Sequence, residues 1–414
     1  MHFVSSALAT TRIASLAGLF VLASGCSGTT GSTTPTTDAG GVNPPVFDAG
    51  TQAITNEFDL RSDMRRLWYE HVAWTRIYLI DAIAGLPETS LTAERLLANQ
   101  SAIGDAIRPL YGDAAATQLT GLLKEHILGA AAVVTAAKAG DQAALAAANT
   151  AWYANADEIA KFLADANPHW TLAALTNHMH THLDRTLAEA KARLTGDWAG
   201  DVTAYDAVED HILTFSDFLT NGLVLQFPDK IAPSPIAGSD EALQVTMRRL
   251  WEEHVLWTRV WLVDQTSKLP DASFAATRLL QNQVDIGNAV KPYYGAAAGN
   301  ALASLLHDHI TGAVALVQAY ESGNEQDINY WYTAWYANGD QIARSLAALN
   351  PYWPLADAQS HMKRHLDLTV DEVSARLQHA YPGDITAYDA VVTHILTFSD
   401  FLADGIALQF TLVK

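Results

Sequence analysis

Five histidines recur at matched positions in two copies of one sequence pattern, and histidine is a residue that binds transition metals. Met64 begins a segment that returns 183 residues later at Met247, and the same offset holds to the end of the repeat. The matched pairs are His71 and His254, His126 and His309, His178 and His361, His182 and His365, and His211 and His394. No lysine of the first copy is matched by a lysine of the second. The pattern therefore predicts a histidine-rich site in each copy.

The spacing of these histidines places them on the inner faces of helices. His71 shares a helical face with Leu67 and Trp74, and His178 and His182 are four residues apart, so both rings project from one side. Imidazoles and carboxylates that converge from facing helices hold iron, copper or zinc. Recurring acids near the histidines are further candidates. The predicted ligands are His71, Glu125, His126, Asp157, His178, His182 and His211 in the first copy, and His254, Asp308, His309, Asp340, His361, His365 and His394 in the second.

Two other interpretations remain open. Buried histidines also serve as hydrogen-bonded core residues, which would make the chain a structural or interaction module. Recurring tryptophans could instead line a pocket for a small molecule such as non-covalent haem. The P-loop, GxGxxG, GxSxG, HExxH and CxxCH motifs do not occur. We therefore assign no reaction and no catalytic residue; storage, delivery or sensing of a metal suits the pattern as well as catalysis, and the pattern favours a binding protein over an enzyme.

The elements that must position the histidines are helices. Apolar residues recur three or four apart throughout, and Gly85, Gly140 and Asn167-Pro168 mark ends. The pattern predicts an all-α protein made of two tandem up-and-down helical bundles, each with five long helices and one short one. In the first copy, predicted helices after the one that ends at Gly85 span about residues 90–108, 114–138, 142–165, 171–194 and 201–225.

The N-terminal residues resemble the signal of a bacterial lipoprotein. An apolar run over residues 13–23 has the length of a signal segment, and Leu22-Ala23-Ser24-Gly25-Cys26 resembles a lipobox. The resemblance implies cleavage before Cys26, acylation of its thiol and, with Ser27 next, an outer-membrane location facing the periplasm or the cell surface. The predicted organisation is a signal at 1–26, a tether at 27–55, bundles at 56–228 and 239–414, and a linker at 229–238.

Composition limits the partners. The net charge is −20, so phosphate neutralisation gives no reason to expect nucleic-acid binding. The expected partners are a metal ion and, through the lipid anchor, a membrane; the sequence does not identify a protein partner. Cys26 is the only cysteine, which excludes an intrachain disulfide.

Several motifs resemble those of a poorly characterised group of small, single-repeat, all-helical bacterial proteins. They are the segment 152–160 (WYANADEIA), the segment 167–170 (NPHW), and Glu70-His71 and Glu125-His126. The resemblance implies a smaller shared site at the positions of His71, His126, Asp157 and His182. The order of the histidines also resembles hemerythrin-type di-iron bundles in part, although Ala130 stands where that pattern has a glutamate.

Overall fold

The protein is all-α, as the sequence predicts. The computed structural model describes residues 56–236 and 238–410. Cys26, the predicted signal and the predicted tether lie outside the described residues. The helices of the first copy are α1 (Glu57–Ala84), α2 (Thr89–Ala106), α3 (Arg108–Ala139), α4 (Gln142–Ala166), α5 (Leu172–Thr195) and α6 (Trp198–Gln226). Those of the second are α7 (Ser239–Thr266), α8 (Ala272–Ser322), α9 (Glu325–Leu349), α10 (Leu355–Leu377) and α11 (Tyr381–Phe410).

Local chemistry determines where these helices begin and end. The side chain of Asp141 accepts hydrogen bonds from the first backbone N–H groups of α4, and Asn324 does the same for α9. Gly140 ends α3 in the left-handed conformation, with φ of 69°, which costs a residue without a Cβ little. These capping residues keep α3 and α4 antiparallel neighbours.

In the second copy α8 covers the stretch that α2 and α3 cover in the first, and it folds back on itself where the backbone of Gly295 is non-helical: a Cβ at Gly287 would lie 2.7 Å from the carbonyl oxygen of Gly299. The sequence predicts a break at residues 109–112, and within α3, which begins at Arg108, the backbone at Gly112 is non-helical as that prediction requires. Both copies bend at a matched glycine, Gly112 with φ of 81° and Gly295 with φ of 79°. The positive φ requires glycine there. The bend is therefore common to both copies although the helix boundaries differ.

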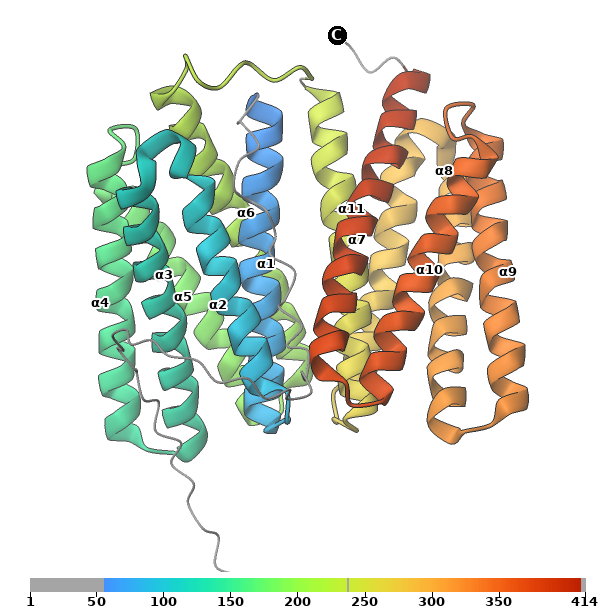
Figure 1. The fold of residues 1–414 in the computed structure, drawn as a ribbon, viewed down its shortest axis with the longest axis horizontal. Helices are drawn as coiled ribbons and strands as arrows, with labels where there is room; N and C mark the ends of the chain where they lie inside the picture. The colour runs from blue at the N-terminus through green and yellow to red at the C-terminus, as the bar shows by residue number, and fades with distance from the viewer. Residues whose placement is uncertain (1–55, 237, 411–414) are drawn as a thin grey trace, which may run out of the picture. The chain divides into compact units, whose positions relative to one another are not determined.

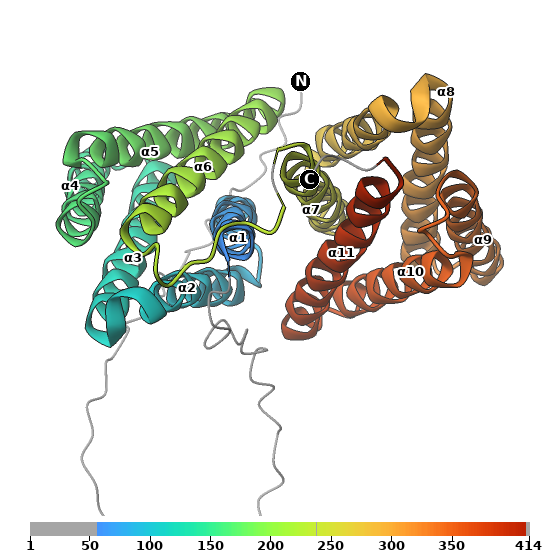
Figure 2. The ribbon, with the colours of Figure 1, turned by 90° about the horizontal axis from the view of Figure 1, so that it is seen from above.

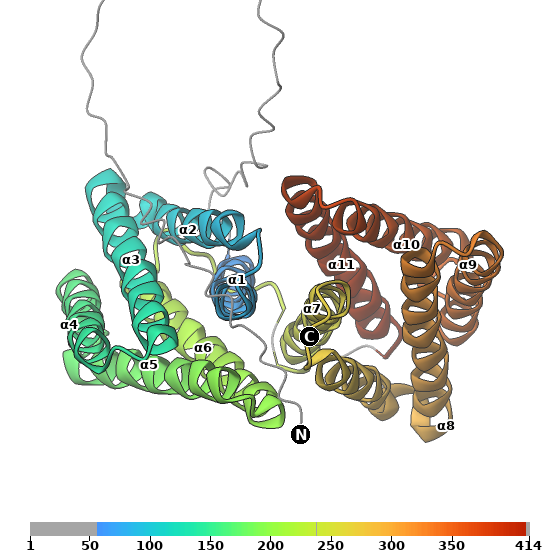
Figure 3. The same cartoon turned by 90° about the horizontal axis from the view of Figure 1, so that it is seen from below.

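Each copy closes on itself as a ring of helices. Consecutive helices pack against each other, and α1 also packs against α6, as α7 does against α11. Within each copy the helices run up and down in turn (Figure 1), and end-on views show the closure of α1–α6 (Figure 2) and of α7–α11 (Figure 3). Residues that point into a ring are shielded from water by all its helices, so polar side chains there need partners.

A buried tryptophan fixes the last helix of each copy. Trp170, which follows α4, lies against Gly222 in α6, and Trp353 lies against Gly405 in α11. The Nε1 group of Trp353 donates a hydrogen bond to the carbonyl of Phe401 (3.2 Å). The glycines allow the indole rings to approach the helix backbone closely.

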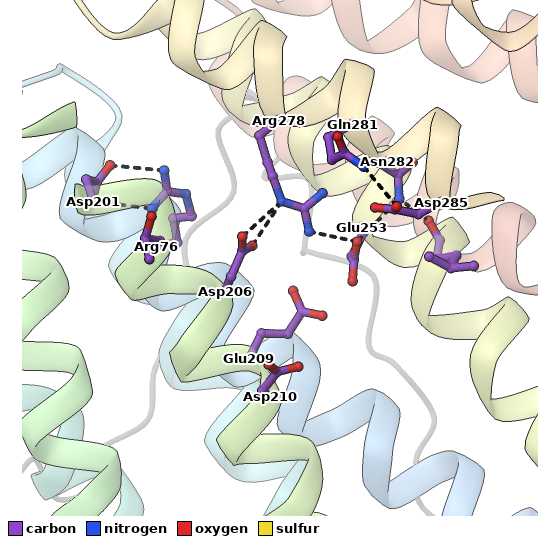
Figure 4. Close-up of polar contacts among 12 residues, drawn as sticks. Arg76, Asp201, Asp206, Glu209, Asp210, Glu253, Arg278, Gln281, Asn282 and Asp285 are labelled. Carbon is purple, nitrogen blue, oxygen red and sulfur yellow. Dashed lines mark hydrogen bonds and ion pairs between the residues drawn. The ribbon is translucent and has the colours of Figure 1, made fainter. Parts of the chain in front are cut away.

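The two copies contact each other through reciprocal ion pairs. Arg95 in α2 donates to Asp389 in α11, with a distance of 2.8 Å between Nε and Oδ2. The matched Arg278 in α8 donates to Asp206 in α6 (3.0 Å) and to Glu253 in α7 (2.9 Å) (Figure 4). The pair between Arg95 and Asp389 therefore recurs as the pair between Arg278 and Asp206, with the two copies exchanged. This reciprocity is typical of the interface between two identical subunits.

Aromatic residues repeat the reciprocity at the same interface. Trp74 meets Tyr388 edge to face with ring centroids 5.5 Å apart, and the matched Trp257 meets Tyr205 at 5.7 Å. The guanidinium of Arg76 lies over the ring of Trp257 at 4.6 Å, a favourable cation–π contact. All five side chains are almost fully buried. The four aromatic rings therefore belong to one hydrophobic core that continues from one copy into the other.

Candidate metal centre

Three histidines of the second copy bring ring nitrogens together inside the helical ring. They are His254 in α7, His309 in α8 and His365 in α10. One nitrogen from each lies within 4.8 Å of the others, and the residues are 3%, 3% and 5% exposed. Three converging imidazoles are a ligand set for zinc, copper or iron, and they leave a further coordination position for water or another ligand.

The first copy also brings the matched histidines near one another, although among the described residues it is the second copy whose three ring nitrogens all lie within 4.8 Å. The Nε2 atoms of His71 in α1 and His182 in α5 are 3.4 Å apart, and the ring centroid of His126 in α3 lies 5.9 Å from that of His182. Two nitrogens bound at about 2.0–2.1 Å to one tetrahedral ion are about 3.3 Å apart. The His71–His182 distance therefore fits two ligands of one ion.

An asparagine at the same position in each copy determines which ring nitrogen of the α3 or α8 histidine is free to bind a metal. Asn155 in α4 donates from Nδ2 to the carbonyl of Leu122 (3.1 Å), which turns its Oδ1 toward Nδ1 of His126 (3.0 Å). An oxygen accepts only from a protonated nitrogen, so Nδ1 carries the hydrogen and Nε2 keeps its lone pair. Asn338 holds His309 in the same arrangement at 3.1 Å. Both rings are thus preset as Nε2 ligands.

Burial keeps the triad imidazoles neutral. Burial lowers the pKa of His71 and of His254 to about 3, and a neighbouring histidine of the triad lowers each further. It lowers the pKa of His126 to about 4, although the bond to Asn155 opposes the shift. The pKa of His182 is held well below its usual value by burial and by His71. Neutral imidazole is the form that binds a metal, so protons do not compete at neutral pH.

The other two predicted histidines of each copy form a separate pair. His211 donates from Nε2 to the backbone carbonyl of His178 (2.9 Å), and the His178 ring stacks on Phe215 with centroids 4.9 Å apart. His394 bonds the carbonyl of His361 in the same way. The Nε2 hydrogen of His211 is thus used by the backbone. The structure does not bring all five imidazoles to one point, because a residue four positions from His182 lies one turn further along α5.

The predicted carboxylate ligands do not reach either triad. Glu125 and Asp308 are exposed because each directly precedes a triad histidine, and neighbouring residues of a helix point about 100° apart. Asp157 is exposed and accepts from His180 (2.8 Å), while Asp340 bonds Arg344. Recurrence between the copies marked these acids as candidates, but their positions on the helices turn them toward solvent. The triads therefore consist of imidazoles alone.

Sequence reasoning did not assign the role of the asparagines. Asn155 and Asn338 occupy matched positions in the two copies, but recurrence alone does not show which group each of them bonds. Their signal lay in their helical position: each stands three residues after a tryptophan, Trp152 or Trp335, whose ring packs on the same histidine. Comparison of the chain with protein-family models, with curated proteins and with solved structures found no match.

Proposed function

We propose that each copy binds one transition metal ion through three histidines, namely His71, His126 and His182 in the first copy and His254, His309 and His365 in the second. The observation that carries the proposal is the convergence of three buried ring nitrogens within 4.8 Å in the second copy. Removing three imidazoles from water without a ligand is unfavourable, and a bound metal offsets that cost. Iron, copper and zinc all suit imidazole donors.

The surroundings of the triads favour holding a metal over transforming a large substrate. The ligand residues are buried within their helical rings, and each comes from a different rigid helix, which gives a preformed site. Storage, delivery or sensing of a metal fits such a site. The lipobox-like residues before Cys26 support an envelope location, with the chain anchored to the outer membrane and facing the periplasm or the cell surface.

Metal content tests the proposal directly. The chain, purified without a histidine tag and loaded with iron, copper or zinc, should hold two equivalents of one of these ions by plasma mass spectrometry. His126→Ala and His309→Ala should each remove one equivalent, and the double variant should remove both. Loss of a residue that only hydrogen-bonds a metal ligand already lowers metal affinity by up to roughly 100-fold, so loss of one of the three ligands themselves should lower it further.

Two matched controls make the result specific. His180→Ala removes an exposed histidine outside the triad, and His178→Ala removes one of the stacked pair; both variants should keep two equivalents. A wild-type chain that takes up none of the three metals would contradict the proposal. The buried histidines would then be hydrogen-bonded core residues of a structural module.

The lowered pKa values predict metal retention in acid. A site of three ordinary histidines, with pKa near 6.5, loses roughly 10⁴-fold in affinity from pH 7 to pH 5 because each ligand must first lose a proton. In this chain the pKa values of about 3 to 4 keep the ligands neutral over that range. We expect affinity at each site to change less than about tenfold, measured by chelator competition. An ordinary acid dependence would show that the triads are solvated.

A further inference from the structure

The second-copy triad opens onto an apolar cavity. The cavity is lined by His254, His309 and His365 and by side chains that include Trp261, Leu279, Ile310, Val314 and Trp335. Among the described residues that line it, none carries a positive charge. A ligand that enters from this cavity reaches the metal position without meeting a group that would bind an anion.

The hydroxyl and carboxyl groups of the cavity wall already have partners. Thr258 donates its hydroxyl to the carbonyl of His254 (2.7 Å), and Thr369 donates to the carbonyl of His365 (2.9 Å). Glu372 is bound by Arg259 (3.1 Å). The hydroxyl groups of Thr258 and Thr369 therefore have no hydrogen left to donate to a polar ligand. The oxygen of Glu372 that binds Arg259 is likewise occupied. The wall suits a small, uncharged molecule.

The charge of the site distinguishes between metals. With three neutral imidazoles as the converging ligands, a divalent ion brings a charge of two into the buried site and a monovalent ion brings one, since the cavity-lining carboxyl group of Glu372 is already paired with Arg259. The cost of burying an ion rises with the square of its charge, so the divalent site costs about four times as much. Copper is the imidazole-binding metal that is monovalent under reducing conditions.

We propose that the triad of His254, His309 and His365 holds copper(I), and that the coordination position facing the cavity binds a small uncharged diatomic such as dioxygen or nitric oxide. Copper(I) has a filled d shell and donates electron density to the π* orbitals of such ligands. The proposal rests on the metal-binding function proposed above and adds the oxidation state and the ligand class.

The first copy supplies a contrast within the same chain. Its matching cavity is lined by residues such as Thr75, Ala130, Trp152 and Thr186, and His71, His126 and His182 do not line it. Access from the cavity to the metal position is therefore a property of the second copy. Carbon monoxide bound to copper(I) should report this difference.

The experiment titrates the full-length, copper(I)-loaded chain with carbon monoxide under anaerobic conditions and records the C–O stretch by infrared spectroscopy. We expect one carbon monoxide per chain. His309→Ala should abolish the band together with one copper. Ala313→Leu places a larger side chain in the cavity one turn from His309; it should keep both coppers and weaken carbon monoxide binding more than tenfold. Ala130→Leu, the matched change in the first copy, should leave the band unchanged.

The outcomes separate the two proposals. Two coppers per chain without a carbonyl band would overturn the ligand proposal and leave metal binding intact. No copper would overturn the copper(I) proposal alone, and uptake of none of iron, copper and zinc would overturn both. A band that survives Ala313→Leu, or that is lost with Ala130→Leu, would show that the ligand does not enter from the second-copy cavity. If Ala313→Leu does not fold, as judged by circular dichroism, Val314→Met narrows the same cavity and should give the same loss of binding.

Discussion

Replacement of Arg76 by methionine should lower the free energy of unfolding by about 3–5 kcal/mol, the cost of breaking a buried ion pair from one side. Arg76 is 1% exposed and donates to Glu189 (3.0 Å) and Asp201 (3.1 Å). Its guanidinium also stacks on Trp257 of the other copy. The variant leaves Glu189 and Asp201 buried with only part of their neutralising charge. Urea denaturation followed by circular dichroism measures the change.

The deficit of this variant should grow with pH. Burial already raises the pKa of Glu189 to about 7, above its unfolded value near 4.5, and loss of Arg76 raises it further. A carboxyl with a raised folded-state pKa contributes stability below its unfolded pKa and loses it as pH rises. The variant should therefore be closer to wild type at pH 5 than at pH 8. Lys161→Met is the control, since the Lys161–Asp165 pair is exposed and contributes at most about 1 kcal/mol. An equal effect of both changes would contradict a buried network.

Gly222→Ala should destabilise the protein by about 3 kcal/mol, the upper end of the usual range for overpacking. A Cβ atom at Gly222 would lie 1.8 Å from Nε1 of Trp170, and one at Gly405 would lie 2.0 Å from Nε1 of Trp353. Each indole is buried, so it can move aside only by displacing the side chains that cover it. The double variant Gly222→Ala/Gly405→Ala should be less stable than either single variant, which thermal unfolding would measure as a lower midpoint temperature.

Gly121→Ala is the matched control for these glycine changes. Gly121 is also helical, but a Cβ there would meet nothing within 4 Å. Alanine has the higher helix propensity, so the control should gain up to about 1 kcal/mol. A similar loss at Gly121 and Gly222 would show that the tryptophan contact is not the cause.

The sequence predicts the helices well because their signals are local. Gly85, Gly140 and Asn167 end helices where the pattern indicates, since each acts through its own backbone conformation or the adjacent turn. The prolines are less exact signals: Pro109 lies in the first turn of α3 and its match Pro292 lies within α8, while the helical backbone is interrupted three residues later, at Gly112 and Gly295. Local signals therefore identify the elements more securely than the exact boundary between two of them.

The candidate site is predicted less completely because its selection depends on tertiary geometry. Periodicity places His126 and His211 on inner faces alike, but only the packed structure shows that His126 joins the triad while His211 bonds a backbone carbonyl. The contact between Arg95 and Asp389 joins residues 294 positions apart, and helical spacing contains no information about such a pair. Hydrogen-bond partners and contacts between copies therefore required the structure.

The reciprocal interface gives this chain contacts like those of a homodimer, but its two halves need not have the same sequence. In a homodimer every substitution occurs twice, once at each related position. Here one polypeptide encodes both halves, so related positions can diverge singly: Glu209 is matched by Val392, and Tyr69 by Glu252. Arg249 binds Glu209 (2.8 Å) on one side alone. The two histidine triads can likewise diverge, because a substitution near one leaves the other unchanged.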